Sequence, residues 1–323
     1  MTLFEATRIY VQRKRSFGLG YQTSQRQLLS FARHAGDIPI NSIVPRQVLS
    51  HLDQAGSSTT TWRIKYHLLK NFFEYWAARG EGETLPMPPI RPAEPLTFIP
   101  YIYSKRELRS LLRETGNCQK WDSCSIDGTT FRMVLLLLYS TGMMAGEAVR
   151  LARQDVDAKA GMLTIRGGRF GRSRRIPIGP DLQHRLQRYV RWTVGRKNLA
   201  GNFFANKDGS PIKPRILSKC FERLRRLVGV LRQDGACYHP RMHDLRHTFA
   251  VHRITTWFKQ DADMNRMLPA LAAYMGQVGL GSAERYLSLT PERFRRELAK
   301  LSPQRRKKRW RNDPALMKFL AEL

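Results

Sequence analysis

Residues 239–253, HPRMHDLRHTFAVHR, concentrate side chains that could do chemistry. The segment holds four histidines and three arginines. His243 and His247 are four residues apart, so they share a face if the segment is helical. Three uses are open: a solvated basic surface, a metal site, or a site that grips phosphate.

A metal site is the least favoured of these uses. A divalent ion needs a third ligand and tolerates positive neighbours poorly. Arg241, Arg246 and Arg253 surround the histidine pair with positive charge, and the sequence offers no acidic cluster to complete a site. We therefore expect no metal here.

Phosphate suits the segment better. Leu245 and Phe249 form an apolar stripe that draws the start of the helix into the core, which disfavours a merely solvated face. His243 and Arg246 then stand together at a helix start, where backbone N–H groups already favour an anion. An HxxR pair also recurs by chance in basic helical proteins. The rest of the sequence is therefore needed to tell a phosphate site from an ordinary basic helix.

The composition points to a polyanionic partner. The 323 residues include 56 Lys and Arg against 26 Asp and Glu, a formal charge of +30, which is too large an imbalance for an ordinary metabolic enzyme. At 42% hydrophobic the chain can build cores for about two domains. It has neither a window of ~18 apolar residues nor a secretory signal, so we expect a cytoplasmic protein without a membrane partner. The four cysteines show no CxxC pairing and are read as reduced and structural.

Proline divides the chain. Five prolines between 86 and 95 forbid a continuous helix and predict an extended linker over 86–102. Before it, TSQRQLLSFARHAG, ending at Gly36, and STTTWRIKYHLLKNFFEYWAARG have helical apolar spacing. Residues 1–85 therefore read as a small helical bundle, 103–302 as a second domain, and 303–323 as a basic tail with a final helix.

The second domain reads as mainly α with a small β-hairpin. A capping box from Ser104 to Glu107 opens one helix, and a buried helix ends at Gly142. Residues 161–168 and 174–179 alternate as two strands joined by a basic tip. Helices follow from Pro180, over about 215–232, from 243, and from Pro291.

Four stretches of this domain follow one another along the chain in this order: STGMMAGEAVRL, IRGGRFGRSRRIPI, MHDLRHTFAVH and YMGQVGLGSAERYL. The order resembles that of the tyrosine recombinases, the phage-integrase-like site-specific DNA strand exchangers, over most of 103–300. The resemblance implies a C-shaped, two-domain clamp on double-stranded DNA, whose N-terminal module is a core-binding domain. It also implies a tetrameric synapse of like or unlike subunits, no cofactor, and a bacterial, nucleoid-associated protein.

The resemblance also assigns roles. Tyr286 would attack the phosphorus and form a 3′-phosphotyrosine, and Arg246 would fork onto two nonbridging oxygens, a geometry lysine cannot copy. His243 would accept or relay the tyrosine proton, and Gln277 would hydrogen bond a phosphate oxygen. Arg169, at the hairpin tip, falls where the family has a lysine.

Met144 falls where the family has its first arginine, and a thioether carries no charge and donates no hydrogen bond. Losing one such donor typically costs ~10²-fold in rate. On a continuous helix turning about 100° per residue, Arg150 and Arg153 point about 240° and 180° away from Met144, so neither is expected to replace it. Arg169 is a poorer proton donor than lysine.

Two functions therefore stay open. The first is strand exchange through a 3′-phosphotyrosine in the integration, excision or transposition of a mobile element, with impaired catalysis. The second is a DNA-binding architectural subunit of a recombination complex. A transcription factor would not need Tyr286 at its spacing, and a type IB topoisomerase would bind DNA without strong site choice.

The predicted DNA contacts lie in both domains. They are Thr59, Thr60, Arg63 and Lys65 at a helix start in the first domain, and Arg172, Arg174 and Arg241 in the second.

Overall fold

A computed structural model describes residues 1–18, 20–54, 58–82, 85–92, 98–120, 123–168, 173–194, 201–236, 238–277, 279, 281–287 and 289. The chain forms two compact units, Met1–Thr97 and Phe98–Leu323. The division falls inside the predicted linker. The predicted helix from Pro291 and the basic tail lie outside the described residues.

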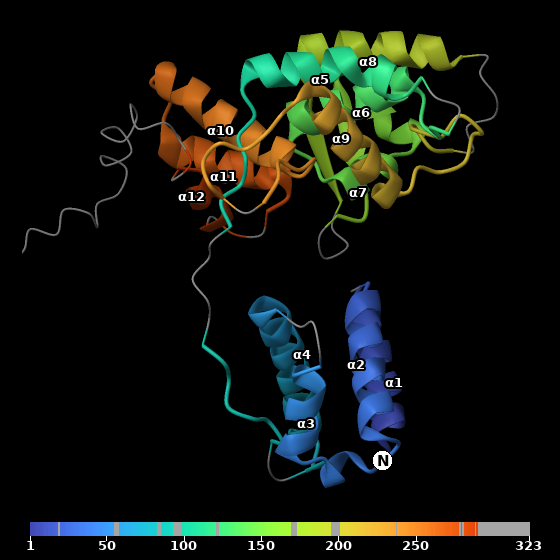
Figure 1. Cartoon of the computed structure of the whole chain (residues 1–323), viewed down its shortest axis with the longest axis vertical. Coiled ribbons are helices and arrows are strands. Elements are labelled where there is room, and N and C mark those ends of the chain that lie inside the picture. Colours follow the sequence, from blue (N-terminus) through green and yellow to red (C-terminus); the bar gives the residue numbers. More distant parts are fainter. Residues whose placement is uncertain are drawn as a thin grey trace, which may run out of the picture. The chain divides into compact units, whose positions relative to one another are not determined.

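The first unit is a helical bundle of α1 (Leu3–Ser16), α2 (Gln22–Ala35), α3 (Pro45–Leu52) and α4 (Thr59–Ala77), with the short 3₁₀ turn η1 (Ile40–Ser42) before α3 (Figure 1). Thr2 and Ser58 cap the first turns of α1 and α4 by accepting backbone N–H groups, as N-cap hydroxyls do. The apolar side chains of α4 that were predicted to share a face are all buried. Both helices predicted here, α2 ending at Gly36 and α4, are confirmed. Two more, α1 and α3, complete the bundle.

Most of the second unit is helical. Its helices are α5 (Lys105–Cys118), α6 (Gly128–Thr141), α7 (Ala145–Val149), α8 (Pro180–Thr193), α9 (Pro214–Val228), α10 (Asp244–Lys259), α11 (Met264–Met275) and α12 (Gly281–Leu287), with a 3₁₀ turn η2 (Arg153–Asp155). The predicted capping box of α5 is formed by Ser104 and Glu107. Helix α6 is buried along most of its length and packs against α5, α8 and α10 (Figure 1). It is therefore the central helix of this unit.

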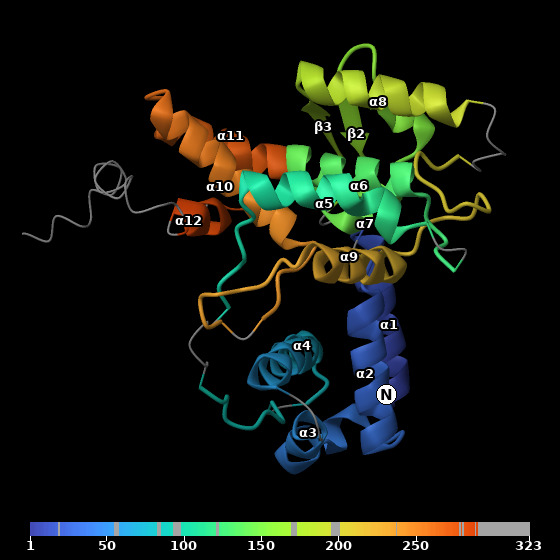
Figure 2. The ribbon, with the colours of Figure 1, turned by 45° about the horizontal axis from the view of Figure 1, so that its top comes forward.

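A three-stranded antiparallel sheet of order β1-β2-β3 completes the second unit. The strands are β1 (Val156–Asp157), β2 (Met162–Ile165) and β3 (Arg174–Pro177), and Leu163 pairs with Ile176. The hairpin of β2 and β3 is the one predicted; β1 adds an edge strand. Helix α8 lies beside the sheet (Figure 2), and the Gln183 and Gln187 amides donate to the carbonyls of Lys159 and Ala158. The predicted fold class, mainly α with a small sheet, is confirmed.

No helix among the described residues is both long enough and apolar enough to cross a membrane.

Candidate active site

Three segments far apart in the sequence meet in the second unit: the turn after α6, the start of α10, and the end of α11 with α12. Helix α12 packs on α10 and α11, and α10 packs on α6. The apolar cluster that joins them includes Phe249, Ile254, Leu271, Met275 and Tyr286. The spacing of apolar residues on α10 thus brings its first turn to the same place as the last described helix.

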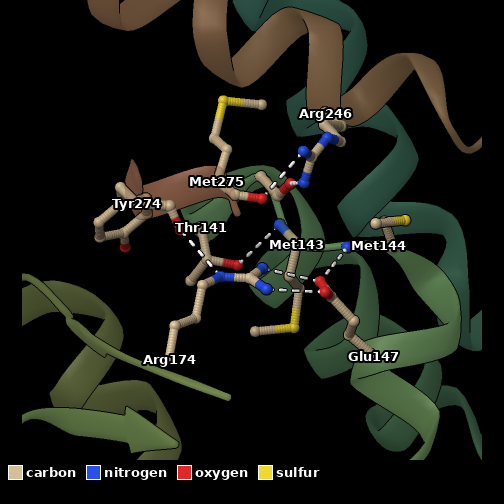
Figure 3. Close-up of polar contacts among 9 residues, drawn as sticks. Thr141, Met143, Met144, Glu147, Arg174, Arg246, Tyr274 and Met275 are labelled. Carbon is tan, nitrogen blue, oxygen red and sulfur yellow. Dashed lines mark hydrogen bonds and ion pairs between the residues drawn. The ribbon is translucent and has the colours of Figure 1, made fainter. Parts of the chain in front are cut away.

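Arg246 lies in the first two turns of α10 and is buried, with 7% of its surface exposed. Its Nη1 donates to the Gly142 carbonyl at 2.6 Å and its Nη2 to the Met275 carbonyl at 2.9 Å (Figure 3). Among the described residues no carboxylate forms an ion pair with it. Burial lowers the pKa of Arg246, while hydrogen bonding to Tyr286 and the charge of Glu147 oppose that change. The guanidinium is thus a buried cation without a matching anion.

Tyr286 is the buried phenol of α12, 4% exposed, and lies beside this cation. The Gln277 amide Nε2 donates to its hydroxyl at 3.0 Å, while Oε1 of the same amide is buried without a hydrogen-bond partner in the described part of the chain. Gln277 was predicted to hold a phosphate oxygen. In this structure it holds the tyrosine hydroxyl.

His247 is a residue of the site that the sequence reasoning missed. Its ring lies 5.2 Å from that of His243 and 5.6 Å from that of Tyr286, between centroids. Burial, together with the neighbouring positive groups, lowers the pKa of His247 to about 4, so the ring is neutral at pH 7. Desolvation and Arg246 also lower the pKa of His243, whose side chain is nonetheless exposed at the mouth of the site. The four-residue spacing of the two histidines was the feature of the sequence that could have identified His247. It indicated that the two rings share a helix face, but not which residues that face contacts.

Arg174 was predicted to contact DNA, and the structure corrects this assignment. Its Nη1 and Nη2 donate to the two carboxylate oxygens of Glu147 at 2.8 and 2.9 Å, and its Nε donates to the Tyr274 carbonyl at 3.1 Å (Figure 3). Glu147 Oε2 also accepts the Met144 N–H at 2.9 Å. Burial raises the pKa of Glu147, but these donors outweigh it and the net pKa is lowered. All three guanidinium nitrogens are engaged, so this buried ion pair ties β3 to α7 and α11.

Two glycines allow these contacts. Gly142 ends α6 at a φ of +63°, and a β-carbon there would stand 2.4 Å from Cδ1 of Phe249. Gly276 follows α11 at a φ of +69°, and a β-carbon there would stand 2.6 Å from Nη1 of Arg174. Positive φ and close approach both require glycine at these positions. Because of these glycines, the carbonyl groups of both turns lie close enough to accept hydrogen bonds from Arg246 and Arg174.

An open pocket of about 610 Å³ lies in front of Arg246. Met144, Gly146, His243 and Arg246 line it together with residues of α6, α9 and the 238–242 loop. Met144 thus occupies the wall of the pocket in which a second arginine was expected from the family pattern. The pocket is large enough for a phosphate group and its sugar neighbours.

The remaining predicted contacts are spread over both units. Arg169 and Arg172 lie outside the described residues. Arg241 is partly exposed at the pocket, 3.4 Å from Asp244 and over the Phe98 ring. At the start of α4, Thr60 is exposed, Thr59 and Lys65 are half-buried, and Arg63 donates to the Arg91 carbonyl. Within the described ranges, no group of three or more His, Cys, Asp or Glu side chains could hold a metal ion.

Comparisons with known proteins agree with this geometry. The model of the phage integrase family matches residues 104–262. The integrase/recombinase y4rB of Sinorhizobium fredii is 28% identical over 316 residues, 96% of this chain and 98% of that protein. Tyrosine recombinase XerC of Staphylococcus saprophyticus is 27% identical over 264 residues, 81% of this chain and 82% of that one.

The fold also matches a solved structure. A lambda integrase tetramer bound to a Holliday junction superposes with a TM-score of 0.62 at 17% identity, covering 88% of this chain and 77% of that one. At that identity the likeness concerns the fold alone. With a buried arginine beside a tyrosine and the family's motifs in order, the chain is similar to the phage integrase family of tyrosine recombinases over residues 104–262.

Proposed function

We propose that the chain exchanges DNA strands through a 3′-phosphotyrosine, in the integration, excision or transposition of a mobile element. Tyr286 is the nucleophile, and Arg246 is the main donor to the phosphate. One observation carries the proposal: a buried guanidinium, which has no carboxylate partner in the described part of the chain, lies beside a buried phenol. A buried charge is costly unless it is paired, and a DNA phosphate would supply the missing anion.

The reaction uses the hydrogen bonds that Arg246 still has free. Its two Nη atoms each donate one hydrogen to a carbonyl and a further N–H bonds to the Tyr286 hydroxyl, which leaves two N–H groups for the nonbridging oxygens. The Tyr286 oxygen forms a bond to phosphorus and gives its proton to His243, the bond from phosphorus to the 5′ oxygen breaks, and this oxygen takes a proton from water and leaves as a 5′-hydroxyl. Attack by a 5′-hydroxyl of a partner strand reverses these steps, so no bond energy is lost to water.

The other site residues handle protons and orientation. Gln277 positions the Tyr286 hydroxyl. His243, exposed in the pocket and neutral because its pKa is lowered, accepts or relays the phenol proton. Arg169 stabilises the leaving 5′ oxygen. Without metal, such a reaction depends on preorganised donors at the phosphate.

Double-stranded DNA is the proposed partner, bound by a two-domain clamp in a tetrameric synapse of like or unlike subunits. The formal charge of +30 supports this, since a clamp that neutralises many phosphates releases many counterions. Thr59, Thr60, Arg63, Lys65, Arg172 and Arg241 are the proposed contacts. Affinity should fall steeply with salt, and a shallow log–log slope would contradict the clamp.

A covalent trap tests the chemistry. A duplex selected by binding from a random pool is nicked near its centre, so that the cleaved end diffuses away and an adduct accumulates. The wild type should form a protein–DNA adduct resistant to denaturation, and Tyr286→Phe should form none. An adduct that persists in Tyr286→Phe would refute the assignment of the nucleophile.

A second candidate is a DNA-binding architectural subunit whose own cleavage is weak. Met144 in the pocket wall favours it, because the thioether leaves the phosphate without a second cation from that position. Tight binding to the selected duplex without adduct in the wild type, and adduct in Met144→Arg, would support this candidate over the first.

A further inference from the structure

We propose that Arg150 supplies the second guanidinium of the phosphate pocket, in place of the arginine that Met144 replaces. This inference rests on the proposed function. Rotation along a continuous helix predicted that Arg150 points away from Met144. In the structure α7 ends at Val149 and Arg150 is its C-cap residue, so its side chain has to reach the pocket past Gly146.

The side chain of Arg150 folds back along α7. A β-carbon built on Gly146 would stand 3.2 Å from Nη1 of Arg150 and 3.9 Å from its Cζ and Nη2. The guanidinium therefore lies against Gly146, one turn toward the start of the helix. Gly146 is one of the residues that line the pocket, as are Met144, His243 and Arg246, and Arg150 lies next to this lining.

The glycine at 146 fits this role. Gly in a helix costs roughly 0.5–1 kcal/mol relative to Ala, and Gly146 needs no positive φ, so the helix itself does not explain it. A β-carbon at 3.2 Å would push the guanidinium away by a few tenths of an ångström. Glycine thus leaves a shallow surface of backbone atoms that both a guanidinium and a phosphate can approach.

Arg150 is an exposed arginine next to the pocket lining. Arg225 lines the pocket but is buried and donates to the Val230 carbonyl, and Arg241 is paired with Asp244. The Arg150 side chain, by contrast, is exposed and has no hydrogen bond or ion pair among the described residues. Its five N–H groups are free for an anion.

A phosphate held by Arg246 from the buried side would then receive Arg150 from the exposed side. Such a pair of guanidinium groups donates to both nonbridging oxygens, which carry the charge as the phosphorus becomes five-coordinate. Because Arg150 reaches the site from a flexible, exposed position, it is less preorganised than an arginine at 144 would be. We therefore expect Met144→Arg to make Arg150 dispensable.

Adduct formation on the nicked duplex, under single-turnover conditions with protein in excess, tests this assignment. Arg150→Ala should slow the adduct 10- to 100-fold, and Arg150→Lys by an intermediate factor because lysine cannot fork. The matched control is Arg153→Ala, an exposed arginine three residues on, which should change the rate less than threefold. The double variant Met144→Arg/Arg150→Ala should recover to within about threefold of wild type. Equal rates for Arg150→Ala and Arg153→Ala would overturn the inference.

A second readout separates this inference from the proposed cleavage. Inorganic phosphate, titrated in a thermal-shift experiment, should stabilise the wild type and Arg153→Ala alike, and Arg150→Ala should need at least about threefold more phosphate for the same shift. That result supports Arg150 even if the wild type forms no adduct, in which case only the cleavage proposal fails. Identical phosphate titrations for Arg150→Ala and Arg153→Ala would refute the role of Arg150, whatever the adduct assay gives.

Discussion

Arg174 and Arg246 both lie largely buried in the second unit, and their charges are met in different ways. Arg174 meets a carboxylate with two parallel hydrogen bonds and a carbonyl with its third nitrogen. Arg246 meets only the neutral carbonyls of Gly142 and Met275 and the phenol of Tyr286. Both cations lose hydration on burial, but among the described residues Arg174 has a carboxylate in contact and Arg246 has none.

This difference separates an arginine that holds the fold from one that awaits a ligand. The pair of Arg174 and Glu147 is complete without DNA and ties a strand to two helices. The unmatched charge of Arg246 makes the site favourable for an anion and unfavourable for a further cation. The two regions should therefore respond in opposite ways to mutation and pH.

The largest effect is expected from Arg246→Leu, which removes the unmatched charge and keeps most of the side chain's bulk. Adduct formation should fall at least ~10³-fold, since a charged forked donor to the reacting phosphate is lost. Stability should change by less than about 2 kcal/mol, because relief of the buried charge offsets the two carbonyls left without a donor. Arg253→Leu, an exposed arginine on the same helix, is the control and should stay within threefold of wild type. If Arg246→Leu kept a tenth of the wild-type rate of adduct formation, the proposed difference in role between Arg246 and Arg174 would be refuted.

A smaller effect, on stability, is expected from Glu147→Gln. It leaves Arg174 buried without its counterion, so unfolding of the second unit should become easier by about 3 kcal/mol. Urea unfolding followed by hydrogen exchange of α10 amides would measure this. Glu222→Gln is the matched control, because its ion pair with Arg226 is exposed and should be worth less than about 1 kcal/mol. If Glu147→Gln and Glu222→Gln lost similar free energies of unfolding, the buried Arg174–Glu147 pair would stabilise the fold no more than an exposed pair does.

The smallest effect is a pH dependence from His247, whose ring lies beside the unmatched cation. Its pKa is about 4 in the folded chain and 6.5 ordinarily, so between these values the unfolded chain binds the extra proton. Stability of the second unit should therefore fall as pH drops through this window, by about 2 kcal/mol between pH 7 and pH 5. The measurement is urea unfolding at the two pH values for wild type and His247→Gln. Equal losses in both proteins would place the titration elsewhere.

Much of the site could be predicted from sequence because its residues lie at fixed spacings in helices. The first turn of α10, the C-terminal Gly142 of α6 and the β2–β3 hairpin follow from apolar periodicity and turn residues. Arg174 could not be assigned this way. It stands among four neighbouring arginines of the hairpin, and only the position of Glu147 across the fold distinguishes it from a DNA contact.

The sequence by itself determined the basic charge, the helical framework and the order of the chemical groups, because composition and local periodicity are properties of the chain. Only the tertiary structure decided which charges are matched. Ion pairing depends on distances of a few ångströms between segments that are 27 residues apart for Arg174 and Glu147, and on which side chains are removed from water. That is why the same residue type forms a buried ion pair at 174 and, at 246, donates to neutral carbonyls and is the proposed phosphate-binding group.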